Sequence, residues 1–492
     1  MESRKNLGDT RGAMIRGTIW SVAMRWSIKG LGLISTVILA RILSPGDYGI
    51  VAMAMLVVGL AEVLVDFGSD TALLRQQSIN TADINSAWSL RVIQGLIVSA
   101  MLGVAAPFAG QYFNEPRVIW VVWVFAICVL AGSFSNIGAT LARKELNFSF
   151  EFRLTVTSKL LGVAITIVAA FLIKDYRALV IGVASGYIVG LLLSYLMHPY
   201  RPTWCTSEFR SMWSFSKWLL ISGIGYFAAR KVDEILAGRV GGAEGMGVYT
   251  VGADIGQLPT AEIGPPINRT LLPTLSTLHD DPERMRSAVL KTVGVVSTLT
   301  LPLGVGMAFV AEPVALLLLG EKWRAAIPFI AIFAIGGAVR VSVGALSTYL
   351  MVLGNSKFLA HATWIEFCAF ILAAAILTPI YGLIGLAEAR LISSVVNCLT
   401  FIIAVTRKNQ IHYQNLFGVL WRPLVGIGVM AIVLSNQSDL DLPLALQLAV
   451  KIIQGAVSYS IFVLAAWRLA GKPDGLEYTI IEKMRNLFRI KY

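Results

Sequence analysis

The chain has 492 residues, of which 56% are hydrophobic and only 14% are charged. Soluble domains usually carry ~25% charged residues, so this composition excludes a soluble globular protein. The net charge of +12 could suit nucleic acid. The basic residues, however, lie in short alternate loops between apolar segments, and we expect no nucleic-acid partner. The composition predicts an all-α, polytopic membrane protein.

About fourteen apolar segments are long enough to span a bilayer. Their approximate bounds are 14–42, 47–69, 84–112, 117–141, 153–173, 178–197, 212–239, 244–272, 287–311, 325–351, 357–378, 382–405, 415–435 and 446–468. Lys and Arg concentrate in every second connection, which places both termini in the cytoplasm by the positive-inside rule. Twelve spans is the main alternative. We expect no cleavable signal peptide, because the polar residues 1–13 lead directly into the first span.

The first two segments form a predicted hairpin around a turn at Pro45. Each arm carries two like charges four residues apart, which places each pair on one helix face. They are Arg25 and Lys29 on the first arm, and Glu62 and Asp66 on the second. Counted from the turn, Lys29 and Glu62 fall at similar depths in the bilayer, and so do Arg25 and Asp66. They either form interfacial salt bridges that hold the two helices together or line a polar cavity used in transport.

Short motifs recur about 198 residues apart. Residues 38–40 precede the first turn and 235–237 precede a second turn at 241–244, and Gly49 and Gly247 follow these turns. An even number of spans per repeat predicts a parallel repeat about an axis along the membrane normal, with a substrate path between the halves. The predicted parts are a lobe over 1–205, a lobe over 206–410, and two additional spans with a basic amphipathic tail over 411–492. We expect the tail to lie on the anionic inner leaflet.

Charged residues also fall inside the predicted spans of the second lobe. Four lie within little more than one helical turn near the predicted bilayer centre, and a fifth reaches similar depth on the returning helix. These five are Arg230, Lys231, Asp233, Glu234 and Asp254, and further charges within spans are Glu262, Arg269, Arg340, Glu366, Glu388 and Arg390. Each charge at mid-bilayer costs ~2.5–3.5 kcal/mol unless it is paired or hydrated. They are either buried ion pairs that set helix registry or the lining of an aqueous cleft, and an arginine-rich cleft suits phosphate.

Other motifs restrict the chemistry. Gly182, Gly186 and Gly190 form a small-residue stripe in the sixth span, which is typical of close helix packing. The chain has no GxxxxGK[ST] loop for ATP phosphates, its four histidines show no metal-ligand spacing, and its four cysteines form no CxxC pair. We therefore expect no cofactor and no metal.

Several short motifs keep their order over nearly the whole chain. They are Leu39-Ala40-Arg41-Ile42 with Gly46, Asp66-Phe67-Gly68, Lys144-Glu145-Leu146-Asn147-Phe148, Asn268-Arg269 to Leu272-Pro273, Asp280-Asp281 and Gly320-Glu321-Lys322-Trp323. Together they resemble the polysaccharide transporters related to the colanic acid exporter. That family belongs to the superfamily that also holds multidrug and toxin extruders and lipid II flippases.

The resemblance implies two six-helix lobes around a central cavity, alternating access, and a bacterial inner-membrane location. The implied cargo is an undecaprenyl-diphosphate-linked oligosaccharide, moved to the periplasmic face for exopolysaccharide or lipopolysaccharide assembly. Membrane lipids, a polysaccharide polymerase and chain-length proteins are the implied partners, and no enzyme activity is expected. The sequence identifies neither the sugar nor the oligomeric state.

Under this hypothesis the basic residues bind the diphosphate, and the acidic residues pair with them or carry a coupling H⁺ or Na⁺. The candidate phosphate-binding residues are Arg230, Lys231, Arg340, Arg25, Lys29 and Arg390. The candidate pairing or coupling residues are Asp233, Glu234, Asp254, Glu62, Asp66 and Glu262. One alternative is a cation-coupled multidrug exporter of the same superfamily, whose pocket should favour acids and aromatics over arginines. The other is a membrane enzyme of polysaccharide assembly, for which the short outer loops leave little room.

Overall fold

The computed structural model describes residues 2–65, 73, 80–145, 147–207, 209–407, 411–436 and 442–471. Every regular element in these ranges is a helix, which confirms the all-α prediction. The chain divides into two compact units, Met1–Gly247 and Val248–Tyr492. The lobe boundaries near 205 and 410 stay predictions, and so does the amphipathic tail, which lies outside the described residues.

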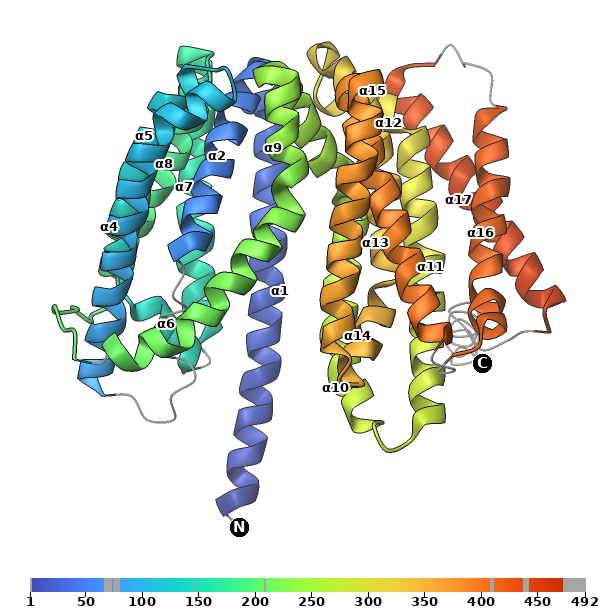
Figure 1. The fold of residues 1–492 in the computed structure, drawn as a ribbon, viewed down its shortest axis with the longest axis horizontal. Helices are drawn as coiled ribbons and strands as arrows, with labels where there is room; N and C mark the ends of the chain where they lie inside the picture. Colours follow the sequence, from blue (N-terminus) through green and yellow to red (C-terminus); the bar gives the residue numbers. More distant parts are fainter. Residues whose placement is uncertain are drawn as a thin grey trace, which may run out of the picture. The chain divides into compact units, whose positions relative to one another are not determined.

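Unit 1 is a bundle of helices, coloured blue to green in Figure 1. The helices are α1 (Glu2–Ile42), α2 (Pro45–Val65), α4 (Thr81–Tyr112), α5 (Arg117–Ser133), α6 (Gly138–Lys144), α7 (Phe148–Ile173), α8 (Arg177–Met197) and the part of α9 (Phe209–Ala261) that ends at Gly247. α7 packs along α8 and α1, while α5 packs along α4, α2 and α8. α5 therefore joins α4 to both α2 and α8.

Unit 2 holds the remainder of α9 and the helices that follow it, coloured green to red in Figure 1. These are α10 (Gly264–Thr277), α11 (Pro282–Phe309), α12 (Ala311–Leu318), the 3₁₀ helix η1 (Glu321–Ala326), α13 (Ile327–Ser342), α14 (Gly344–Val352), α15 (Ser356–Arg407), α16 (Tyr413–Ser435) and α17 (Leu444–Leu469). α11 packs against α13 and α16, and α13 packs against α15. A core that includes the buried Val289, Leu346 and Val405 joins α11, α14 and α15.

Two long helices are broken at glycines. The backbone of α9 has φ of 60° at Gly242, and that of α15 has φ of 61° at Gly382. Residues with a Cβ rarely adopt positive φ, so glycine suits both positions. The first break confirms the turn predicted at 241–244, and the second falls at the start of the segment predicted at 382–405. Each of these helices therefore holds two of the predicted spans.

In the described part of the chain, ten helices are long and apolar enough to cross a membrane, or eleven if the bent pair of α5 and α6 is one span. This confirms a multi-pass membrane protein. Two observations account for part of the difference from fourteen. The broken helix over 357–407 counts once although it holds two predicted spans, and α9, which holds the segment predicted at 212–239 and part of that at 244–272, is not among the ten. The number fourteen stays a prediction.

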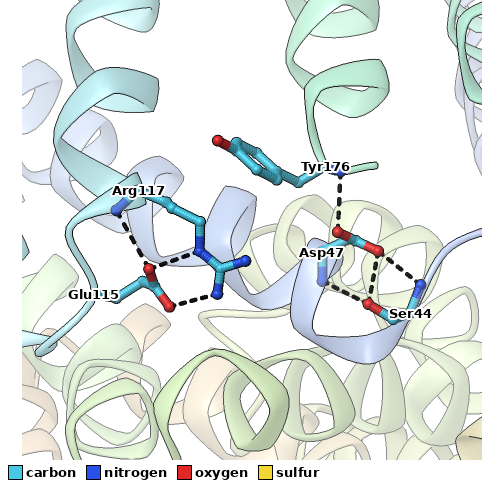
Figure 2. Close-up of polar contacts among 5 residues, drawn as sticks. All are labelled: Ser44, Asp47, Glu115, Arg117 and Tyr176. Atoms are coloured by element: carbon cyan, nitrogen blue, oxygen red, sulfur yellow. Dashed lines mark hydrogen bonds and ion pairs between the residues drawn. The ribbon is translucent and has the colours of Figure 1, made fainter. Parts of the chain in front are cut away.

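The tips of three helix pairs in unit 1 meet at one polar cluster, drawn in Figure 2. Ser44 and Asp47 cap α2 reciprocally, since the Asp47 carboxylate accepts from the Ser44 backbone N–H at 2.8 Å and the Ser44 hydroxyl accepts from the Asp47 N–H at 3.3 Å. The same carboxylate accepts from the backbone N–H of Tyr176 at 3.0 Å, which ties α2 to the start of α8. Arg117 lies beside the Tyr176 ring, 5.9 Å from its centroid, and donates two bonds of 2.8 Å to Glu115. These hydrogen bonds hold the pKa of Glu115 below its ordinary value near 4.5, against the opposing effect of burial.

Replacing Asp47 with alanine should destabilise unit 1. The change removes the carboxylate that accepts from the Ser44 and Tyr176 backbone N–H groups, and loss of a capping contact costs about 0.5–2 kcal/mol. Urea unfolding of the purified protein in detergent would measure the loss, with the surface variant Asp175→Ala as a control, since Asp175 contacts Arg177 in an exposed ion pair. Equal unfolding midpoints for the two variants would show that the Asp47 contacts contribute nothing.

The predicted repeat has a counterpart in one close backbone contact within unit 1. A Cβ at Gly49 would overlap the carbonyl oxygen of Ala243, and a Cβ at Gly247 would overlap the carbonyl oxygen of Pro45. Pro45 and Ala243, like Gly49 and Gly247, are separated by about 198 positions. A two-fold relation between two repeats would produce this reciprocal pattern, so the contact supports the repeat that we propose.

Candidate functional site

An open cavity of about 750 Å³ lies in unit 1, between α2, α4, α5, α8 and α9, and its wall is mainly apolar. Ligand pockets in proteins commonly enclose ~300–1,000 Å³. Its polar lining residues are Glu62, Arg91, Gln94, Ser133, Ser135 and Tyr187. Val63, Val98, Val129 and Phe227 supply apolar wall. The cavity therefore combines a few polar groups with an apolar surround, as binding sites for small molecules do.

Two of these polar groups come from one face of α4. Arg91 and Gln94 are three residues apart, so both side chains leave the helix on the same side. The Arg91 guanidinium donates to the backbone carbonyl of Ser135. That carbonyl belongs to the connection between α5 and α6, where the chain bends by 55°, and it therefore lies outside the backbone hydrogen bonding of either helix. The break in α5 thus provides the acceptor that holds Arg91 at the cavity wall.

Glycines form much of the remaining wall. Gly59, Gly95, Gly132, Gly186 and Gly190 all line the cavity. A glycine lets a ligand approach the backbone closely because it has no Cβ. The environments of these glycines differ, since a Cβ at Gly95 would overlap the Ser133 side chain whereas a Cβ at Gly186 would meet nothing within 4 Å. Gly186 therefore borders open space.

The predicted glycine stripe on α8 has two functions in the structure. A Cβ at Gly182 would overlap the Thr166 side chain of α7, and a Cβ at Gly162 would lie 3.4 Å from the Cα of Gly186. These approaches confirm close packing of α7 on α8. Gly186 and Gly190 additionally line the cavity, which the small-residue pattern did not indicate.

Unit 2 holds a second polar network, between α13 and α15. Nη2 of Arg340 lies 3.3 Å from Oε1 of Glu366 and donates to the Ser394 hydroxyl at 3.2 Å. The Asn397 amide donates to the other Glu366 oxygen at 2.6 Å. The Arg390 side chain is buried and lies 5.8 Å from the centroid of the Phe370 ring. Both oxygens of Glu366 are thus engaged, and the network joins both halves of the broken helix α15 to α13.

The other predicted site residues are placed as follows. Lys231 and Glu234 form an ion pair of 2.5 Å along α9. Asp233, which lies between them in the sequence, is buried. Arg230 and Asp254 are exposed, Glu262 lies partly buried in the connection from α9 to α10, and Arg25 and Lys29 are partly buried on α1. Glu62 lines the cavity of unit 1, while Asp66 lies outside the described residues. The pairing of Lys29 with Glu62 and of Arg25 with Asp66 stays a prediction.

Arg91, Gln94 and Tyr187 of the cavity are among the residues that the sequence analysis missed. Arg91 is a charge inside the predicted span 84–112, so the criterion that selected Arg340 could have found it. For Gln94 and Tyr187, no local pattern distinguishes a cavity position from a packed one. Only the arrangement of neighbouring helices shows that they share a wall with Glu62.

Comparison with known proteins decides the family. The family described as polysaccharide biosynthesis protein matches residues 38–328, more than half of the chain. The chain belongs to this family of polysaccharide biosynthesis proteins. The match includes the whole unit-1 cavity, and it confirms the resemblance drawn from the short motifs.

Relatives and solved structures agree with this assignment. This polysaccharide biosynthesis protein is 25% identical to the succinoglycan biosynthesis transport protein ExoT of Rhizobium meliloti, over 92% of this chain and 93% of ExoT. It is 24% identical to the lipopolysaccharide biosynthesis protein WzxC of Escherichia coli, over 83% of this chain and 84% of WzxC. The lipid II flippase MurJ in an inward closed conformation has the same fold, with a TM-score of 0.72, 14% identity, and coverage of 92% of this chain and 99% of MurJ.

Proposed function

We propose that this polysaccharide biosynthesis protein translocates undecaprenyl-diphosphate-linked oligosaccharide repeat units across the bacterial inner membrane by alternating access. The observation that carries the proposal is the open cavity with Arg91 and Glu62 at its wall, which lies between helices of a multi-pass polysaccharide biosynthesis protein. Polar groups around an open space in a membrane protein are costly unless they contact water or a polar ligand. Both termini are cytoplasmic in this proposal, since that orientation satisfies the positive-inside rule.

The diphosphate requires cations, and the predicted basic residues differ in solvent exposure. Arg230 is exposed, the Arg340 side chain is partly buried, and Arg390 is buried beside Phe370. By exposure we place Arg230 first among the phosphate-binding candidates, with the partly exposed Lys231, Arg25 and Lys29 as supporting cations. Arg340 and Arg390 contribute to the same task only if the network of α13 and α15 rearranges. The acids Asp233, Glu234, Asp254, Glu62, Asp66 and Glu262 remain the candidates for charge pairing or for coupling to H⁺ or Na⁺.

Deletion of the gene in the source bacterium tests the proposal. We expect lipid-linked repeat units to accumulate on the cytoplasmic face, because their polar glycan cannot cross the hydrocarbon layer unaided. A membrane-impermeant glycosidase or lectin, applied to right-side-out and to inverted vesicles, would measure the orientation. Re-expression of the wild type should restore periplasmic exposure and polymer, whereas Arg230→Ala should restore neither despite normal membrane levels. The exposed Arg324→Ala serves as the matched control.

Other outcomes of the same experiment would contradict the proposal. Repeat units that reach the periplasmic face in the deletion strain would show that another protein moves them. Altered drug susceptibility without loss of polymer would identify a multidrug exporter, and glycosyl transfer by the purified protein would identify an enzyme of polymer assembly.

A further inference from the structure

The cavity of unit 1 carries no net charge from its two ionic lining residues. Arg91 contributes a positive charge and Glu62 a negative one. A diphosphate offers only acceptor oxygens and carries negative charge, so a carboxylate in the same cavity opposes its binding. This cavity is therefore a poor site for the diphosphate of the proposed substrate.

The same lining suits hydroxyl groups. A hydroxyl both donates and accepts hydrogen bonds, so a site for several hydroxyls needs donors and acceptors together. Glu62 accepts, Arg91 donates, and Gln94 and Tyr187 can do both. Phe227 and the Tyr187 ring add apolar surface to the wall, which can cover the C–H face of a sugar ring.

The side-chain amide of Gln94 has a buried donor that lacks an acceptor. Nε2 of Gln94 is buried and has no hydrogen-bond partner within the described ranges of the chain. Buried amide donors are nearly always satisfied, and an orphan costs free energy. Because Gln94 lines the cavity, rotation of its side-chain amide toward the cavity would let a hydroxyl of a bound ligand accept from this donor.

We propose that the unit-1 cavity is the glycan subsite of the transporter, in which Gln94 and Tyr187 recognise sugar hydroxyls of the repeat unit while the diphosphate binds outside it. This inference rests on the proposed function. It assigns recognition of the sugar to the part of the cavity wall that holds Gln94 and Tyr187. Gly186 keeps the subsite open, since its missing Cβ leaves space with no atom within 4 Å. The glycine-rich wall lets the ring approach the backbone.

Binding measurements on the purified protein in nanodiscs test the subsite. The two probes are the lipid-linked repeat unit extracted from the producing strain and undecaprenyl diphosphate without sugar. Gly186→Leu should fill the cavity and weaken binding of the glycan-bearing lipid by about 10-fold or more, without changing the affinity for undecaprenyl diphosphate. The control is Gly103→Leu on α4, where a Cβ also meets nothing within 4 Å but which is not among the residues that line this cavity. It should bind both lipids as the wild type does.

A second variant keeps the test decisive if Gly186→Leu does not fold. Gln94→Met preserves the side-chain length and removes the amide, and should weaken only the glycan-bearing lipid, by about 3- to 10-fold. Unchanged binding of that lipid to the folded variants, or equal loss of both lipids, would overturn the subsite while leaving the flippase proposal standing. Failure of the wild type to bind either lipid would instead overturn the proposed function, and the subsite with it.

Discussion

Gly49→Ala and Gly247→Ala should each destabilise the protein, although alanine is the better helix former. Alanine in a helix interior is favoured over glycine by about 1 kcal/mol. At these two positions, however, the added Cβ would overlap a backbone carbonyl oxygen, of Ala243 and of Pro45 respectively. Backbone atoms cannot move aside as side-chain ends can, and overpacking costs about 1–3 kcal/mol or more. We expect a net loss of about 2 kcal/mol for each variant.

Gly46→Ala is the matched control, because it lies in the same turn and a Cβ there would meet only the Ser44 hydroxyl, at 3.8 Å. The control should be neutral or stabilising. Urea titration in detergent micelles, followed by tryptophan fluorescence, gives the midpoint for each variant. A stabilised Gly49→Ala would show that the close approach of 45–49 to 243–247 does not exist. The double variant should cost less than the sum of the single ones, because one opening of the contact relieves both overlaps.

Loss of either partner of the Arg340–Glu366 pair should have the second large effect. The two side chains are 33% and 20% exposed and lie 3.3 Å apart. Arg340→Met leaves the Glu366 carboxylate, and Glu366→Gln leaves the Arg340 guanidinium, without its charge partner inside a membrane-spanning bundle. Breaking a buried pair from one side costs about 3–5 kcal/mol, and the partial exposure places this pair near the lower limit.

The double variant Arg340→Met/Glu366→Gln should be more stable than the sum of the two losses predicts, because no lone charge remains. The exposed pair of Arg324 and Glu321, with side chains 59% and 73% exposed, is the control, and its removal should cost less than about 1 kcal/mol. Strictly additive losses at Arg340 and Glu366 would contradict the network. Polymer export by the folded double variant would further show that Arg340 holds α13 to α15 and does not bind phosphate.

Local patterns along the chain were enough to predict most of the long helices, although the segments predicted at 117–141 and 325–351 are each broken into shorter helices. Apolar length identified the helices, and turn residues identified the break between α1 and α2 at residues 43–44. The break of α9 at Gly242 also lies inside the predicted second turn. These features depend on residues within one or two helical turns, where spacing and backbone preferences act directly. Charges within apolar segments were also visible as such, because their cost in a membrane does not depend on the neighbouring helix.

The partners of those charges were decided by the tertiary structure. Arg91 contacts the Ser135 carbonyl because α5 breaks beside it, and Glu366 contacts Asn397 because α15 turns back at Gly382. Whether Gly186 meets a helix or open space depends on how α8 lies against α2, α4 and α5. Such contacts join residues that are far apart in the sequence. The periodicity of a helix predicts only which face a residue occupies, and it does not predict which residue of another helix packs against that face. The sequence alone thus determined a polytopic helical membrane protein with ionised groups among its spans, whereas helix packing decided which of those groups share a cavity.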